Sequence, residues 1–270
     1  MSPTTERVDD AAAPTPAPIP GLITLVINLD RAPDRMAHMA RELQAVGLSY
    51  TRIAAVDGAT LERPHPDFSE GHYRHLHGRH WAPKELGCYL SHIQCLRTFL
   101  ASDAQYALIL EDDVRLDPDI RPVLTQALAQ TRHWNLLRLS TVNSGTWWPV
   151  RPLGRTNLAV CLTREKGAGG YVVDRVAAGQ MVDKLLPMRL SWDIAFDLEW
   201  LLGFKTLGVY PMVVQQNAGF GTDIQDDLDK IKVRSKLKYL TVAPFRLFLE
   251  LSRLGYRLFR LMHLRVLSRA

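Results

Sequence analysis

The first continuous apolar run of the chain covers residues 22–29, and its β-branched side chains predict a buried strand. The following segment predicts a helix from Pro33 to about Val46, because Asp30 stands at an N-cap position and Gly47 ends the pattern. Residues 50–54 predict a second strand. A strand, a helix and a strand in close succession indicate a βαβ unit, whose strands are parallel.

The same alternation continues downstream, so the chain is predicted to be an α/β protein. The pattern favours helices over 84–100, 119–131, 175–186 and 192–202, and strands over 106–110, 135–140, 158–163, 170–173 and 205–210. Residues 59–83 hold three prolines and five histidines and predict a long loop. Long loops are usually functional, and we expect this one to close over an active site and exclude water.

The two ends of the chain differ in composition from its middle. Residues 1–20 are rich in Ala, Pro and Thr and are expected to be disordered, because they cannot bury a core. A single domain is predicted over 21–225, followed by a basic helical tail over 226–270. The N-terminus lacks the apolar segment of a secretory signal, and no run of about 18 apolar residues predicts a transmembrane helix.

The tail predicts an amphipathic helix that begins with Pro244 at its first position. Leucines at 247, 251, 254, 258 and 261 form one stripe, and Arg246, Arg253, Arg257 and Arg260 form a second stripe roughly 100° away. An arginine-striped helix with aromatic residues suits an anionic membrane surface. The alternative is a helix that docks on the domain or on a second copy of the chain.

Charge and cysteine content narrow the classes of function. Residues 230–270 hold eleven Lys or Arg and one acid, so the net charge of +5 comes from the tail and the rest of the chain is acidic. This distribution argues against a nucleic-acid-binding face. Three scattered cysteines, Cys88, Cys95 and Cys161, suit buried thiols in a reducing compartment better than disulfides or a zinc finger. We therefore expect a cytoplasmic protein, peripheral on the inner face of the membrane.

The strongest chemical signal is the acidic cluster Glu111, Asp112 and Asp113, which follows the strand predicted over 106–110. Ligands of open α/β sheets bind at the carboxyl ends of strands, where hard oxygen ligands suit Mg²⁺ or Mn²⁺. Such a metal stabilises a diphosphate leaving group as a Lewis acid. The cluster alone also fits a metal-dependent phosphatase or nuclease, or an ordinary solvated turn.

Four segments in register carry a more specific signal. They are Val26-Ile27-Asn28-Leu29-Asp30-Arg31 with Asp34-Arg35, Ala55-Val56-Asp57-Gly58, Glu85-Leu86-Gly87-Cys88-Tyr89-Leu90-Ser91-His92, and Leu108-Ile109-Leu110-Glu111-Asp112-Asp113-Val114. Their order and spacing resemble glycosyltransferase family 25, which includes bacterial lipooligosaccharide galactosyltransferases and collagen galactosyltransferases. The resemblance spans about residues 22–225.

The resemblance implies a GT-A-like (Rossmann-like) fold, a nucleotide-sugar donor and a divalent metal, Mn²⁺ or Mg²⁺. It places Glu111 and Asp113 at the metal, and it implies a donor site lined by Asn28, Arg31, Arg35, Asp57, Ser91, His92, Asp112 and Gly170. Arginine suits phosphate because its fork donates two hydrogen bonds. The plainer alternatives are surface charge for the arginines, a turn residue at 57 and a structural histidine at 92.

One segment departs from the family pattern. The chain has Gly167-Ala168-Gly169-Gly170-Tyr171 where relatives commonly have a Gly-Thr-His-type stretch. The small residues still permit close backbone approach to a sugar.

Inverting transfer needs a carboxylate that deprotonates the acceptor hydroxyl. Asp193 is the candidate, beside Trp192, which could stack on a sugar ring, while Asp197 and Glu199 are weaker candidates. The alternative for Asp193 is a helix N-terminal acid. Asn217 or Asp223, in a segment that also resembles the family, could complete the metal or diphosphate shell.

These observations predict an inverting, metal-dependent hexosyltransferase. The resemblance implies UDP-galactose as the favoured donor and a glycan acceptor of lipopolysaccharide or cell-surface polysaccharide synthesis. The acceptor is expected to be lipid-linked. Two alternatives remain: a metal-dependent phosphoester hydrolase, and a non-catalytic, membrane-anchored binder of sugar nucleotides.

Overall fold

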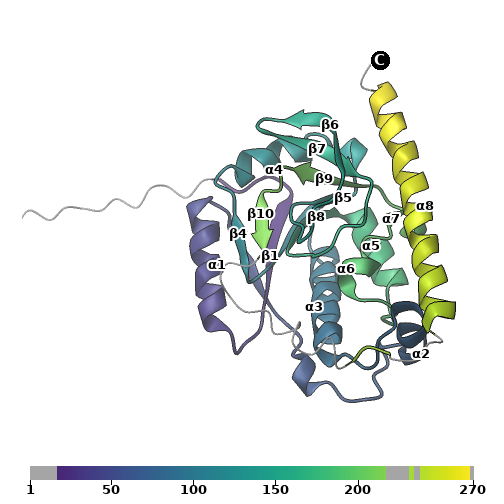
Figure 1. Cartoon of the computed structure of the whole chain (residues 1–270). Helices are drawn as coiled ribbons and strands as arrows, with labels where there is room; N and C mark the ends of the chain where they lie inside the picture. The colour runs from purple at the N-terminus through teal and green to yellow at the C-terminus, as the bar shows by residue number, and fades with distance from the viewer. Residues whose placement is uncertain (1–16, 217–230, 234–237, 268–270) are drawn as a thin grey trace, which may run out of the picture.

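The structure is a computed structural model that describes residues 17–216, 231–233 and 238–267 (Figure 1). The expected disorder of the first sixteen residues, and the sites suggested at Asn217 and Asp223, lie outside the described residues. Among the described residues, no helix combines the length and the apolar character needed to cross a bilayer.

Eight strands form one sheet in the order β2-β1-β3-β8-β5-β9-β7-β6. They are β1 (Leu22–Asn28), β2 (Thr51–Ala54), β3 (Tyr106–Glu111), β5 (Leu136–Arg138), β6 (Trp147–Leu153), β7 (Thr156–Cys161), β8 (Gly170–Asp174) and β9 (Thr206–Tyr210). Strands β7 and β8 run against the other six. Two short strands, β4 (Val114–Leu116) and β10 (Val214–Gln216), pair antiparallel beside the large sheet.

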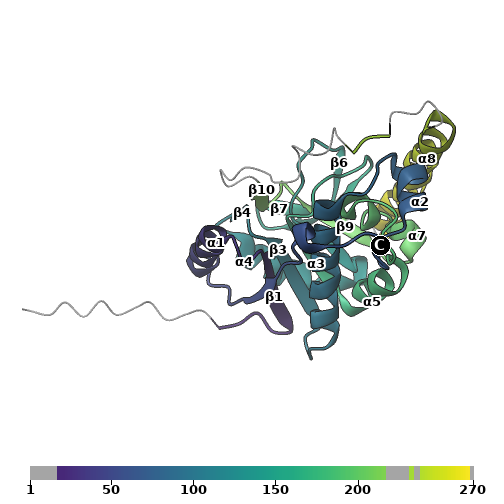
Figure 2. The same ribbon diagram turned by 90° about the horizontal axis from the view of Figure 1, so that it is seen from below.

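Helices cover both faces of this sheet (Figure 2). They are α1 (Pro33–Ala45), α2 (Glu70–His72), α3 (Pro83–Leu100), α4 (Ile120–Leu128), α5 (Arg175–Lys184), α6 (Trp192–Ala195), α7 (Glu199–Leu202) and α8 (Lys238–Leu267), with single turns at Gly58–Thr60, Tyr73–His77 and Thr131–His133. Alternate residues of β1 point into opposite cores. Leu25 and Ile27 face α3 and α5, while Val26 faces α1 and α4.

The predicted βαβ unit is confirmed, because β1 pairs with β2 in parallel across α1. Other expectations were wrong in detail. Ala32, not Asp30, stands at the N-cap of α1, and no side chain caps it. The helix expected over 192–202 is two short helices, and the loop expected over 59–83 contains helical turns. Strands β4, β6 and β10 were not predicted.

Helix α8 begins before Pro244, which lies inside it, and its two faces are reversed from the expected orientation. The membrane hypothesis needed its arginines in contact with lipid. Instead Arg253 and Arg257 are 1% and 5% exposed against the domain, whereas Leu247 and Leu251 are 59% and 61% exposed. The predicted arginine stripe is therefore a docking face. Four of the five leucines of the predicted stripe are exposed, whereas Leu261 is buried in the core.

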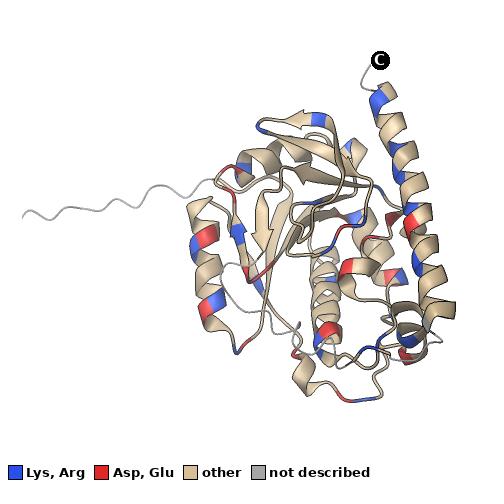
Figure 3. Cartoon of the chain, viewed as in Figure 1, with Lys and Arg blue, Asp and Glu red and all other residues tan. Residues whose placement is uncertain are grey.

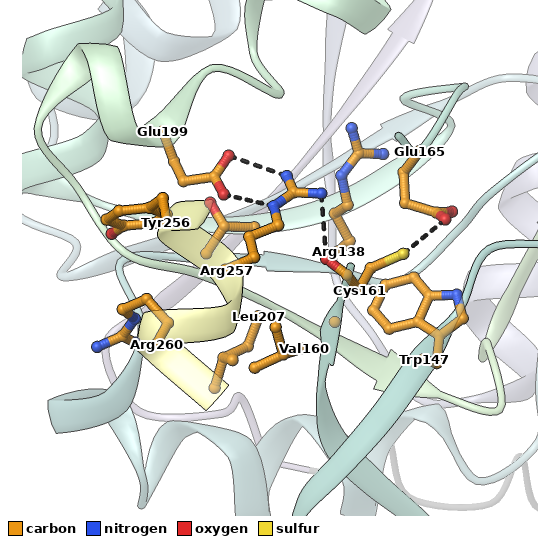
Figure 4. Close-up of a pocket in the computed structure, with 12 residues that line it drawn as sticks. Arg138, Trp147, Val160, Cys161, Glu165, Glu199, Leu207, Tyr256, Arg257 and Arg260 are labelled. Carbon is orange, nitrogen blue, oxygen red and sulfur yellow. Dashed lines mark hydrogen bonds and ion pairs between the residues drawn. The ribbon is translucent and has the colours of Figure 1, made fainter. Parts of the chain in front are cut away.

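Two arginines of α8, Arg253 and Arg257, are buried against carboxylates that lie between α6 and α7 and at the start of α7. Arg257 pairs with Glu199 (Nε to Oε1, 2.7 Å) and with Asp197 (Nη2 to Oδ1, 2.8 Å). Arg138 and Arg253 each reach Asp197 at 3.2 Å. Figure 4 shows Arg257 bonded to Glu199 between α8 and the sheet, and Figure 3 shows the spacing of the basic residues along α8. This network fastens the tail to the domain.

Candidate functional site

Three parallel strands end at one edge of the sheet and bring the motif segments together. Strand β1 lies between β2 and β3, with Asn28 opposite Ala54 and Ile27 opposite Glu111. The residues that follow these strands therefore share one edge, as expected for the carboxyl ends of parallel strands. Arg31, Asp57 and Asp113 are thus not separated onto opposite edges of the sheet.

Asn28 organises this edge through its side-chain amide. Its Nδ2 donates to Asp112 Oδ2 (2.7 Å) and to the Ala32 carbonyl (2.9 Å), and its Oδ1 accepts from Arg52 Nε (2.9 Å). Arg35 reaches the other oxygen of Asp112 at 3.4 Å. Burial nevertheless raises the pKa of Asp112 above its ordinary value, against these partners. Because its amide is fully engaged, Asn28 holds Asp112 and Arg52 in place.

Arg31 and Asp57 lie beside this group and form an ion pair. The Asp57 carboxylate also accepts from the Ala59 amide at 2.9 Å, which caps the turn Gly58–Thr60. The side chains of Arg31 and Asp57 are 49% and 32% exposed, so they can reach a ligand. The turn role considered for Asp57 and the donor role are therefore compatible.

Helix α3 packs so closely on the turn after β2 that two motif glycines are required. A Cβ on Gly87 would lie 2.6 Å from the Val56 carbonyl oxygen, and a Cβ on Gly58 would lie 2.3 Å from the Pro83 carbonyl oxygen. Ser91 secures the same contact, since its hydroxyl accepts from the Val56 amide (2.8 Å) and donates to the Gly87 carbonyl (2.7 Å). Ser91 was predicted to line the donor site, but it is 1% exposed and positions the turn instead.

Replacing Gly87 with Ala should therefore destabilise the protein by about 1–3 kcal/mol, because backbone atoms must move to admit the methyl group. Gly179 in α5 provides a matched control, since a Cβ there meets nothing within 4 Å. Gly179→Ala should be neutral or stabilising by up to about 1 kcal/mol through helix propensity. Urea unfolding of both variants checks this expectation, and equal effects would contradict the proposed contact.

The side chain of Glu111 lies between partners from α3 and β10. Its Oε1 is 3.3 Å from His92 Nε2, and its Oε2 accepts from Gln216 Nε2 at 2.8 Å. The other ring nitrogen of His92 lies 3.1 Å from the Tyr171 hydroxyl. Trp192 stacks on the His92 ring at 4.7 Å with an interplanar angle of 6°. Trp192 is 3% exposed, so the prediction that it stacks on a sugar ring is wrong.

Asp113 carries the least satisfied oxygen of the acidic cluster. Its Oδ1 is buried and has no hydrogen-bond partner. Burial, then the charges of Glu111 and Asp112, raise the pKa of Asp113 to about 7. A divalent cation would supply the missing partner and relieve the repulsion, so these residues fit the Mn²⁺ or Mg²⁺ that the sequence predicted.

Asp193 lies at the start of α6, where the Ser191 hydroxyl donates to its Oδ1 at 2.5 Å. Burial and then the charges of Glu111, Asp193, Glu85 and Asp113 raise the pKa of the Cys88 thiol well above its ordinary value. Asp193 and the acidic cluster thus both act electrostatically on the Cys88 thiol. The weaker candidates Asp197 and Glu199 are each 1% exposed and bound to arginines, so they are not available as bases.

The glycine-rich segment before Tyr171 is packed rather than open. A Cβ on Gly169 would lie 2.4 Å from Gln216 Cγ, and a Cβ on Gly170 would lie 2.8 Å from Val214 Cγ1. The small residues admit strand β10, which overturns our expectation that Gly170 leaves its backbone open to a sugar. This packing places Gln216 within hydrogen-bond distance of Glu111.

Sequence reasoning missed three residues of this site. Arg52 was not singled out, Gln216 was passed over for its neighbour Asn217, and Cys88 was treated as an ordinary buried thiol. The position of Cys88 within the third motif segment was the available signal. Gln216 is located only by the pairing of β10 with β4.

Comparison with known proteins gives an independent result. The profile of "Glycosyltransferase family 25 (LPS biosynthesis protein)" matches residues 22–166. A "Glycosyltransferase 25 family member" of Drosophila pseudoobscura pseudoobscura is 33% identical over 233 residues, which are 74% of this chain and 36% of that protein. The "Procollagen galactosyltransferase 1" of Danio rerio is 25% identical over 177 residues, covering 60% of this chain and 29% of the relative.

A third relative is the human "Inactive glycosyltransferase 25 family member 3", which is 30% identical over 123 residues, 42% of this chain and 21% of that protein. The chain thus spans well under half the length of each of these three relatives. The mixed α/β sheet, with its acidic cluster at the carboxyl end of β3, agrees with the predicted GT-A-like fold.

Proposed function

This chain belongs to glycosyltransferase family 25, and on that premise we propose that it transfers galactose from UDP-galactose to a glycan acceptor with inversion at the sugar carbon. The observation that carries the proposal is the convergence of the motif segments on one sheet edge. That edge holds an exposed ion pair, Arg31 with Asp57, and a buried carboxylate with an unpartnered oxygen, Asp113. A nucleotide and a diphosphate-bound cation need these two kinds of group side by side.

Each group has a role in the proposed reaction. Arg31 donates to phosphate oxygens, and Arg35 is the second arginine near the nucleotide. Asp57 accepts from the uracil or the ribose. Glu111 and Asp113 would hold Mn²⁺ or Mg²⁺, and a cation there would supply Lewis-acid stabilisation of the departing diphosphate. Asp193 accepts the proton of the acceptor hydroxyl while that oxygen attacks the sugar carbon opposite the leaving group.

A screen of UDP-sugars with and without metal tests the proposal. We expect slow release of galactose from UDP-galactose in Mn²⁺ or Mg²⁺, loss of that release in chelator, and faster transfer when a glycan acceptor is added. Phosphate release from simple esters, with no effect on UDP-sugars, would instead support a phosphoester hydrolase. Donor binding without turnover would support a silent binder, which matters because some members of the family are named inactive.

We further propose that the acceptor is lipid-linked and that the outward face of α8 rests on a bilayer at the cytoplasmic side. Tyr239, Leu240, Leu247, Phe248, Leu251, Leu254, Leu258, Phe259, Met262 and Val266 are all exposed on α8. Apart from Tyr239, they fall within an arc of roughly 140° at 100° per residue. Within residues 240–262, all of which the structure describes, that arc contains no charged residue.

Two features favour lipid over a second copy of the chain. The arc is broader than the narrow seam of a paired coiled coil. In the sequence, basic residues stand on both sides of the apolar stretch, at 234, 236, 238, 265 and 269, and basic side chains attract anionic lipid headgroups. The arginines between them face the domain, so apolar burial rather than arginine attraction supplies the proposed affinity.

The protein should therefore sediment with lipid vesicles and remain bound at about 1 M salt, where charge attraction is screened. Leu251→Glu with Leu258→Glu should release it, because both side chains are exposed on the apolar arc. Val176→Glu with Leu201→Glu is the matched control, since these exposed apolar residues lie on α5 and α7. A dimer in solution that the first pair dissociates, with no vesicle binding by the parent protein, would contradict the membrane proposal.

A further inference from the structure

Three potential metal-binding side chains of different chemistry converge beside the acidic cluster. Cys88 and His92 come from successive turns of α3, and Glu111 ends β3. Their sulfur, nitrogen and carboxylate oxygen atoms all lie within 4.8 Å of one another. In the part of the chain that the structure describes, this is the one group of three such residues that comes this close.

The histidine is held in the orientation that a metal ligand needs. Its Nδ1 lies 3.1 Å from the Tyr171 hydroxyl, which leaves Nε2 directed at Glu111. Its ring is stacked on Trp192, and its side chain is 1% exposed. Metal-bound histidines almost always have their second nitrogen fixed by such an outer partner, which sets the ring orientation.

The chemistry of these ligands differs from that of the acidic cluster. Thiolate, imidazole and carboxylate together suit Zn²⁺, whereas Mg²⁺ and Mn²⁺ prefer oxygen ligands alone. Three protein ligands with an open fourth position form the usual zinc arrangement in sites that admit a substrate. As residues, Cys88 and Glu111 have intermediate exposure, so the group lies at the boundary between the protein interior and solvent.

We propose that Cys88, His92 and Glu111 form a second cation site, selective for Zn²⁺ or a similar thiophilic ion, at the edge of the donor site. Glu111 belongs both to this site and to the oxygen-ligand pair with Asp113. A zinc ion held by Cys88 and His92 draws Glu111 away from that pair. Zinc therefore inhibits transfer by weakening its activation by Mn²⁺. This consequence rests on the proposed function, but the binding of zinc does not.

Cobalt spectroscopy on the full chain tests the binding directly. Co²⁺ should produce a near-ultraviolet sulfur-to-cobalt absorption that Zn²⁺ displaces. Cys88→Ser should abolish the band and weaken zinc binding by at least about tenfold, as loss of a metal-site partner does. Cys95→Ser is the matched control, because Cys95 is a buried thiol of the same helix and is not part of the group. A band that survives Cys88→Ser would overturn the proposal.

Two further measurements keep the result independent of folding and of the enzymatic assignment. In the unaltered protein, Zn²⁺ but not Mg²⁺ should protect Cys88 from alkylation, and equal labelling in both ions would overturn the site. In the transfer assay, the ratio of rates with and without zinc should be small for the parent protein and near one for Cys88→Ser. If the cobalt band behaves as expected but no UDP-sugar is turned over, the zinc site stands and the proposed function fails.

Discussion

Asp113→Asn is expected to lower UDP-galactose turnover on the order of 10³-fold or more while the protein remains folded. The substitution keeps the shape of the side chain and removes the charge. It therefore eliminates a metal ligand without opening a cavity. The unpartnered Oδ1 of Asp113 is the buried oxygen that a divalent cation would satisfy.

The pH dependence of the stability of the metal-free protein distinguishes a metal-ligand role for Asp113 from a structural role. Burial and the neighbouring acids raise the pKa of Asp113 to about 7 in the folded protein, above its unfolded value of about 4. The folded state therefore binds this proton more tightly, and the stability it contributes is lost as pH rises through about 7. Raising the pH from about 5 to about 8 should therefore lower the free energy of unfolding of Asp113→Asn less than that of the parent protein.

Thermal unfolding with and without Mn²⁺, together with the turnover assay, measures both effects. Mn²⁺ should raise the unfolding temperature of the parent protein at about pH 8 and leave that of Asp113→Asn nearly unchanged. Asp103→Asn is the control, because Asp103 is an exposed acid before β3. Full activity of the parent in chelator, or unfolding of Asp113→Asn regardless of metal, would show that the metal assignment is wrong.

Arg257→Met is expected to destabilise the protein by about 3–5 kcal/mol, because it leaves two buried carboxylates short of a partner. Arg257 binds Asp197 and Glu199 and also donates to the Thr163 carbonyl at 2.9 Å. A methionine of similar length fills the space but cannot replace these bonds. Because Asp197 follows α6, the loss should also disturb the segment that carries Asp193.

The adjacent residue Leu258 gives a matched control on the same helix. It is 40% exposed on the outward face, so Leu258→Ala should change the stability by no more than about 0.5 kcal/mol. Urea unfolding compares the two variants. If Arg257→Met is as stable as Leu258→Ala, the arginine network does not hold α8 on the domain.

Local patterns were enough to predict the βαβ unit at the start of the fold. The apolar run at 22–29, the proline at 33 and the glycine at 47 predicted β1 and α1, and their succession predicted a parallel β2. The patterns work here because β1 is buried on both faces, which gives a continuous apolar run, and α1 buries one face. They failed for β4 and β10, which are three residues long and exist through their pairing with each other.

The candidate site was likewise predicted only in part from the sequence. The motif residues Arg31, Asp57 and Asp113 were found from the sequence, because parallel strands bring their carboxyl ends to one edge. Which side chains remain open to a ligand was not accessible from the sequence. Ser91 and Trp192 bear groups suited to binding a sugar, yet both are buried by contacts with distant segments.

The sequence by itself determined that the tail is an amphipathic helix with separate leucine and arginine stripes, since a stripe depends only on residue spacing. Only the tertiary structure decided which stripe faces the protein. Asp197 and Glu199, some sixty residues earlier in the chain, form an acidic site beneath α8 that pairs with Arg253 and Arg257. Buried carboxylates must be neutralised, so the arginines turn inward and the leucine stripe, apart from Leu261, is left on the surface.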